Sequence, residues 1–266
     1  MAERDYKAFI VEGEAREPLI IDNISKIFLT HGNFKIITLP AGLNIYMLWK
    51  KLKEDDFDTD IMEVLRENRE ELAEQLAGLS RDDFSEVYLF FDYDGHQNNL
   101  GAGDEEDVLD QMLFCFDNET ENGKLYISYP MVEALRDFEP GVCGNKDNCF
   151  AVIERLGDYK ALSARRAVYP QFKMYDYALW KDVIDVFSMR LSCLMNLART
   201  IDYELYVEKI NPYEILQLEK TEIEKKRVFI LSAFPEFLLD YFGVKLWKTC
   251  VRHPKNMLEK KECKSA

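Results

Sequence analysis

Residues 86–95 read EVYLFFDYDG, and this stretch decides the fold that the sequence predicts. Its first half is an apolar run rich in β-branched and aromatic residues, which is typical of a strand buried on both faces of a parallel sheet. Asp92 and Asp94 end that strand, where open α/β sheets bind their ligands. Side chains two residues apart on an extended segment point to the same side, so both carboxylates are expected to face one cation.

Strands and helices alternate on both sides of this stretch. Further strands are expected at 6–11, 34–39 and 124–128, and helices at 17–30, 43–53, 61–76 and 104–116, with another helix starting at 131–137. This order predicts an α/β fold with a mostly parallel sheet flanked by helices. Residues 1–140 are expected to form this domain, with a helical insertion at about 55–80. Residues 141–266 are expected to form a mainly helical region, with long helices at 174–200 and 213–242.

Composition and charge bound the possible functions. The chain has 266 residues, 47% of them hydrophobic, which is enough for a full globular core. No apolar run is long enough to cross a membrane and the first residues resemble no secretory signal, so a cytoplasmic location without membrane contact is expected. Residues 1–150 carry 33 acidic and 14 basic side chains, whereas residues 151–266 carry 16 and 20. An acidic half that holds a cation and a mildly basic half that meets phosphates would suit a nucleic-acid enzyme, although simple drift of surface charge explains the counts equally well.

Two further carboxylates follow predicted strands. Glu12 ends the first strand and is followed by Gly13, and Glu133 lies just after the fourth. Oxygen ligands of this kind suit Mg²⁺ or Mn²⁺ better than zinc. Such an ion can activate water and neutralise charge on a phosphodiester. The candidate catalytic residues are Glu12, Asp92, Asp94 and Glu133, and the candidate metal ligands are Glu12, Asp92 and Asp94.

The segments VEGE at 11–14 and FFDYDG at 90–95 together resemble the Toprim domain of topoisomerases, primases and related nucleases. The resemblance covers about residues 5–138. It implies that Glu12 and Gly13 match the family's glutamate and glycine, and that Asp92 and Asp94 match its metal-binding DxD pair. The spacing of 80 residues between Glu12 and Asp92 exceeds that of minimal Toprim modules. The helical insertion expected at about 55–80 accounts for the difference. The segment YISYPMVEAL at 126–135 resembles a segment of Toprim proteins linked to abortive infection. In those proteins a glutamate just after the proline lies near the metal, so the resemblance implies this position for Glu133.

A Toprim domain followed by a helical region is similar to the nuclease effectors of bacterial anti-phage systems such as PARIS. This similarity implies a magnesium-dependent nuclease that cleaves nucleic acid, with RNA such as tRNA favoured over DNA. It also implies a regulatory protein partner, expected to be an ATPase, because no Walker A loop occurs in this chain. The helix expected at 61–76 and the helical second half are the candidate docking surfaces. Homodimerisation stays open.

The basic residues after 150 are candidate contacts for nucleic acid. Aromatic residues lie among them, and charge combined with base stacking suits a single strand. An ordinary amphipathic surface explains the same pattern equally well. The basic residues are Arg155, Lys160, Arg165, Arg166 and Lys173, and the aromatic residues are Tyr159, Tyr169, Phe172 and Tyr175.

Three alternatives remain open from the sequence. The Toprim-like core could be inactive and serve as an interaction module. A small-molecule phosphatase of the haloacid dehalogenase type also uses DxD, but there the motif follows the first strand and continues differently from Asp94-Gly95. A zinc site could be made by Cys143, Cys149, Cys250 and His253, although the first pair is loosely spaced and lies far from the second, which favours unrelated thiols.

Overall fold

The computed structural model describes residues 6–54, 59–93, 105–141 and 149–252. The chain divides into two compact units, one made of residues 1–92 and 96–126, the other of residues 93–95 and 127–266. The division falls inside strand β5, upstream of the boundary expected at residue 140. Among the described helices, none has both the length and the apolar character needed to cross a membrane.

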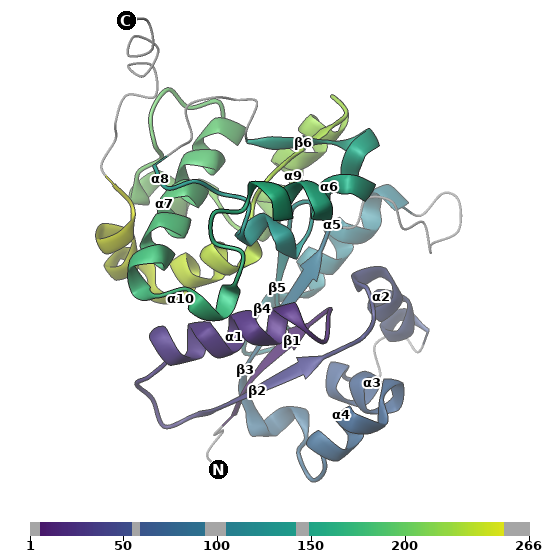
Figure 1. The fold of residues 1–266 in the computed structure, drawn as a ribbon. Helices are drawn as coiled ribbons and strands as arrows, with labels where there is room; N and C mark the ends of the chain where they lie inside the picture. The colour runs from purple at the N-terminus through teal and green to yellow at the C-terminus, as the bar shows by residue number, and fades with distance from the viewer. Residues whose placement is uncertain (1–5, 55–58, 94–104, 142–148, 253–266) are drawn as a thin grey trace, which may run out of the picture. The chain divides into compact units, whose positions relative to one another are not determined.

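A five-stranded sheet runs in the order β2-β1-β3-β5-β4 (Figure 1). Strand β1 pairs in parallel with both β2 and β3, while β4 pairs antiparallel with β5. The predicted α/β fold with a mostly parallel sheet flanked by helices is therefore confirmed, and β4 is an addition that the sequence did not predict. The strands are β1 (Tyr6–Val11), β2 (Lys35–Pro40), β3 (Phe84–Asp92), β4 (Asp117–Asn118) and β5 (Gly123–Ser128).

The centre of the sheet explains why the apolar run folds as it does. Strand β3 is buried from Val87 to Phe91, and Ala8 to Val11 of β1 are completely buried beside it. The Phe9 ring lies 5.3 Å from the Tyr88 ring and 6.1 Å from the Phe90 ring, centroid to centroid. Each such side chain contributes roughly 1.5–3 kcal/mol when fully buried. This packing fixes the register of β1 against β3, and thereby the positions of the residues that follow both strands.

The helix expected at 61–76 is two helices, α3 (Ile61–Asn68) and α4 (Glu70–Gln75), because Arg69 between them has extended backbone. Figure 1 shows both beside β2, the outer strand of the sheet. The Gln75 amide donates to the Thr38 carbonyl at 3.1 Å, and the Arg69 guanidinium donates to the Pro40 carbonyl at 3.3 Å. Since Ala41 N–H points to β1, these alternate carbonyls point away from the sheet. The insertion therefore covers an edge that another strand could pair with.

The remaining helices of the first unit are close to those predicted. Helix α1 contacts β1 and β2, and α2 contacts α3. Asn44 caps α2 by accepting a hydrogen bond from Met47 N–H at 2.9 Å. These elements are α1 (Arg16–Ile27), α2 (Ile45–Lys53), α5 (Glu105–Cys115) and the 3₁₀ turn η1 (Arg81–Asp83).

The second unit is mainly helical, as predicted, but its elements differ in detail. The helix expected at 213–242 is interrupted by a strand, β7 (Arg227–Phe229), which pairs antiparallel with β6 (Phe150–Val152). The helix expected from 131 is a short 3₁₀ turn, η2 (Val132–Leu135). Its other helices are α6 (Leu156–Arg166), α7 (Tyr177–Leu194), α8 (Tyr203–Lys209), α9 (Pro212–Ile223) and α10 (Ala233–Cys250), with 3₁₀ turns η4 (Ile153–Arg155) and η5 (Phe172–Met174).

Candidate metal centre at the carboxyl end of the sheet

Glu12 and Asp92 lie together at the carboxyl ends of adjacent parallel strands. The Glu12 N–H donates to the Phe90 carbonyl at 3.2 Å and the Gly42 N–H donates to the Glu12 carbonyl at 3.1 Å, so the Glu12 backbone is held from both sides. Its side chain then turns across to β3, where Oε2 accepts the Asp92 N–H at 3.2 Å. The strand ends that carry Glu12 and Asp92 are adjacent, as expected, and both side chains are only partly buried. That their carboxylates share one ion stays a prediction.

A third carboxylate, that of Glu17, lies at the same strand end and was not a candidate from the sequence. Glu17 sits in the first turn of α1, is 7% exposed, and accepts the Gly13 N–H through Oε1 at 3.2 Å. A Cβ atom on Gly13 would lie 2.8 Å from Glu17 Oε2, so glycine leaves the space that this carboxylate fills. The available signal was its spacing, five residues after Glu12, but a first-turn glutamate is also what the helix dipole favours.

Glu14, in the same loop as Glu12, has a different role. Glu14 is exposed and its Oε1 lies 2.6 Å from Arg69 Nη1, so its charge is balanced by the residue that joins α3 to α4. Glu12 and Glu17 instead point their carboxylates at backbone N–H groups of the strand ends. The Glu14 carboxylate is therefore used in an ion pair, whereas the carboxylates of Glu12 and Glu17 are oriented by backbone N–H groups.

Asp94, the second aspartate of the DxD pair, lies outside the described residues, so its place stays a prediction. Within the described ranges, no group of three or more His, Cys, Asp or Glu side chains is arranged closely enough to hold a metal ion. Mg²⁺ needs only one or two protein carboxylates, with water and substrate phosphate completing its shell. The oxygen donors of Glu12 and Asp92 fit that requirement, and Asp94 is expected to add to it.

Glu133 is buried in the second unit. It lies in η2, is 2% exposed, and its Oε1 is 4.0 Å from Nζ of Lys160 on α6. Lys160 itself is largely exposed. Because Glu133 and the Glu12–Asp92 pair belong to different units, the expectation that all three share a site stays a prediction.

The five basic residues proposed for nucleic acid are all exposed, on or near α6 and η5. Arg166 is also bound to Asp137, Nη2 to Oδ2, at 2.5 Å. The sequence reading was wrong about most of the aromatic residues among them. Tyr159, Phe172 and Tyr175 are at most 6% exposed and cannot stack on bases, whereas Tyr169 is 38% exposed.

The cysteines offer little support for a zinc site. Cys149 and Cys250 are buried and neither is in a disulfide, and neither belongs to a metal-holding group among the described residues. Burial raises the pKa of the Cys250 thiol to about 11, which disfavours the thiolate that zinc binds. Cys143 and His253 lie outside the described part of the chain.

A buried acidic residue lies on α9. Glu219 is completely buried, its Oε2 accepts the Phe229 N–H at 2.9 Å, and its Oε1 has no hydrogen-bond partner within the described residues. Burial raises the Glu219 pKa well above its ordinary value, and the nearby Glu222 charge adds to the effect. Burial and the Glu219 charge also raise the pKa of Tyr93 to about 12. Burial therefore favours the protonated form of Glu219.

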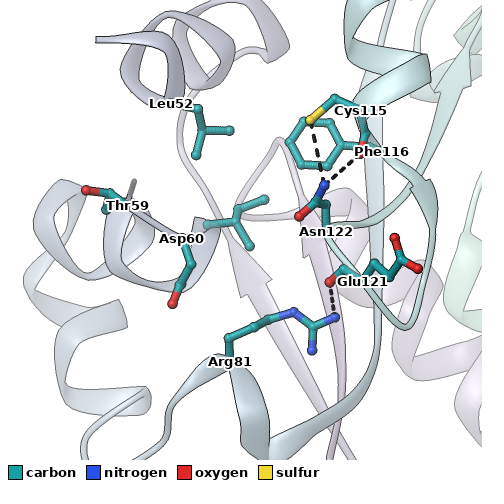
Figure 2. Close-up of a pocket in the computed structure, with 9 residues that line it drawn as sticks. Leu52, Thr59, Asp60, Arg81, Cys115, Phe116, Glu121 and Asn122 are labelled. Atoms are coloured by element: carbon teal, nitrogen blue, oxygen red, sulfur yellow. Dashed lines mark hydrogen bonds between the residues drawn. The ribbon is translucent and has the colours of Figure 1, made fainter. Parts of the chain in front are cut away.

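A pocket of about 130 Å³ lies elsewhere in the first unit (Figure 2). Arg81 and Asn122, which line it, lie shortly before β3 and β5, so it is at the amino end of those strands. Two of its polar side chains are bound to backbone: Asp60 caps α3 through Met62 N–H at 2.7 Å, and Arg81 donates to the Phe84 carbonyl at 2.9 Å. These bonds indicate a structural role. The lining residues are Leu52, Thr59, Asp60, Ile61, Arg81, Cys115, Phe116, Glu121 and Asn122.

The site therefore consists of Glu12 and Asp92, placed together by β1 and β3, with Glu17 behind the turn that carries Glu12. The resemblance to Toprim domains, which rests on the two short motifs, stays a prediction. Comparison of the chain with protein-family models, with curated proteins and with solved structures gives no match.

Proposed function

We propose that this protein is a metal-dependent nuclease of the Toprim type that cleaves phosphodiester bonds, with RNA such as tRNA as the favoured substrate. The observation that carries the proposal is the contact between Glu12 Oε2 and Asp92 N–H at the carboxyl ends of two adjacent parallel strands. That edge of an α/β sheet is where ligands bind. Two acidic residues meeting there from positions 80 residues apart is the arrangement that the motifs imply.

Each residue has a defined part in this proposal. Glu12 and Asp92, with Asp94, would hold Mg²⁺ or Mn²⁺, which when bound supplies a Lewis acid and an activated water. The Asp92 N–H orients the Glu12 carboxylate, and the Gly13–Glu17 hydrogen bond holds the turn after β1. Glu17 is thereby a positioning residue.

A matched pair of substitutions tests the proposal. Purified protein is incubated with total RNA and with plasmid DNA, with Mg²⁺ or with chelator, and compared with Glu12→Gln, Asp92→Asn and Glu14→Gln. Cleavage is expected to require the metal, to fall to background in the first two variants, and to survive in Glu14→Gln. The control removes the same charge two residues from Glu12, from a side chain paired with Arg69.

Stability separates lost chemistry from lost folding. Removing one of two neighbouring carboxylates relieves repulsion in the metal-free protein, so the melting temperature of Asp92→Asn is expected to equal or exceed that of the wild type. Circular dichroism on the same samples checks this. Metal-independent cleavage, or a folded Asp92→Asn protein with full activity, would refute the nuclease assignment. Turnover of a phosphomonoester without cleavage of nucleic acid would favour a small-molecule phosphatase. The absence of any turnover would favour an inactive interaction module.

A toxic nuclease needs restraint, and we propose a separate regulatory ATPase, as in anti-phage defence. The exposed glutamates of α3 and α4 support a docking role, because exposed acidic side chains are available to a basic partner surface. Charge reversal of this set should abolish partner capture while cleavage in vitro persists. If the variant retains the partner, the surface is wrong. The set is Glu63, Glu67, Glu70 and Glu74.

A further inference from the structure

Exposed apolar side chains are concentrated in residues 165–177, from the end of α6 to the first residue of α7. Val168, Tyr169, Met174 and Tyr177 are 57%, 38%, 70% and 44% exposed. They are four of the eleven large hydrophobic side chains that are exposed in the described part of the chain. A group of exposed apolar side chains on one short segment marks an interaction surface more often than the same residues scattered singly.

Two buried aromatic residues hold this segment in place. Phe172 and Tyr175 are at most 6% exposed, and the Tyr175 ring packs 5.7 Å from Trp180, centroid to centroid. The Tyr175 hydroxyl donates to the Tyr169 carbonyl at 3.0 Å. The Tyr169 ring stacks on Phe138, with centroids 6.0 Å apart and planes 22° apart. The exposed side chains therefore stand on an ordered backbone, which lowers the entropic cost of binding.

Basic residues accompany the apolar ones. Arg165 and Lys173 are exposed, and Arg166 keeps part of its surface while bound to Asp137. Asp176 is the acidic residue of the segment, and its carboxylate caps α7 by accepting Leu179 N–H at 2.8 Å. Residues 165–177 thus carry three positive and one negative formal charge.

The two properties together select a class of partner. A second copy of the same segment would bring like charges together, which disfavours a symmetric contact. A nucleic-acid duplex offers phosphates but keeps its bases stacked inside, and proteins read double-stranded RNA by shape and backbone. A single strand offers phosphates and exposed base faces at once, which matches a basic and aromatic surface.

We propose that residues 165–177 bind single-stranded nucleic acid, with Arg165 and Lys173 on phosphates and Tyr169 and Tyr177 stacked on bases. This inference rests on the proposed function for its substrate class. The nuclease would then bind unpaired segments of its substrate. The stacking residues would be the exposed Tyr169 and Tyr177, and not the buried Tyr159, Phe172 and Tyr175 expected from the sequence.

Binding of labelled 20-nucleotide RNA and DNA single strands to the full chain, measured by fluorescence anisotropy in EDTA, tests the inference without cleavage. Duplexes of the same length serve as competitors. Single strands are expected to bind more tightly than duplexes. Tyr169→Ala and Tyr177→Ala are each expected to weaken binding by about 5- to 150-fold, the loss typical of one stacked base. Lys173→Ala should reduce the salt dependence by roughly 0.7 in log–log slope.

Tyr213→Ala is the matched control, because Tyr213 is 40% exposed on α9, outside this segment. Tyr169→Phe should bind like the wild type, since the ring is kept. Equal affinity of Tyr169→Ala, Tyr177→Ala and Tyr213→Ala would overturn the inference, as would tighter binding of duplexes, or binding of an acidic peptide in place of any nucleic acid. Intact single-strand binding by a protein that never cleaves would refute the nuclease proposal and leave this surface standing.

Discussion

Replacing Gly13 with alanine tests the turn that carries Glu12. The added methyl group would lie 2.8 Å from Glu17 Oε2, so the carboxylate has to move and its hydrogen bond with Gly13 N–H is lost. Losing a hydrogen bond to a charged group costs about 1.5–3 kcal/mol. The alanine also restricts the unfolded chain, which offsets about 0.4–1 kcal/mol. The expected net loss of unfolding free energy is therefore about 0.5–2.6 kcal/mol.

The same substitution should change sign when Glu17 is absent. In a Glu17→Ala background the methyl group meets no carboxylate, and only the entropic gain of about 0.4–1 kcal/mol remains. Urea unfolding of the wild type, both single variants and the double variant completes the thermodynamic cycle. If Gly13→Ala is equally destabilising with and without Glu17, the packing of Glu17 against Gly13 does not explain the glycine.

Four other predictions concern buried charge, the edge of the sheet and metal affinity. Because burial raises the Glu219 pKa, the folded protein keeps a proton that the unfolded chain releases above about pH 4.5. Wild-type stability therefore falls as pH rises, by at most about 1.4 kcal/mol per pH unit. Glu219→Gln should remove this pH dependence in urea titrations from pH 5 to 8. Burial also raises the pKa of Glu222, but hydrogen bonds from Arg227 and a neighbouring lysine outweigh it and lower that pKa. Glu222→Gln should therefore destabilise the protein at pH 7. Its stability should approach that of the wild type as pH falls through the lowered pKa. Truncating both Arg69 and Gln75 to alanine should uncover the β2 edge and promote self-association, and unchanged sedimentation at high concentration would count against edge protection. Glu17→Gln should weaken Mg²⁺ binding by about 10- to 100-fold, measured by calorimetry, and an unchanged affinity would remove its positioning role.

The sequence predicted the sheet and the adjacency of the strand ends that carry Glu12 and Asp92, and physical reasons explain why. A long apolar run that ends in acidic residues and glycine is typical of a buried strand, and parallel strands bring their carboxyl ends to one edge. The same reasoning could not find β6 or β7, since each has three residues and shows no periodicity. It also could not place the break at Arg69, because that break depends on tertiary contacts with Pro40 and Glu14.

Burial of individual side chains was the other limit. Tyr159, Phe172 and Tyr175 looked like a stacking surface because they alternate with basic residues, yet they pack inward. Glu17 looked like an ordinary first-turn glutamate, and only the turn at Gly13 shows that it is buried at the strand end. Neither distinction is written in the spacing of residues.

The pairing of β1 with β3 has a consequence for the order of events during synthesis. Glu12 and Asp92 are separated by 80 residues, so the ribosome needs about 4–16 s to make the second after the first. Strand β1 can pair with β2 early. Its other edge cannot pair, and the Glu12 carboxylate cannot accept the Asp92 N–H, until β3 has been made. A nascent chain therefore carries half of its proposed catalytic centre for several seconds. If the finished protein cuts RNA, the chain is expected to be inactive at least until Asp92 has been made.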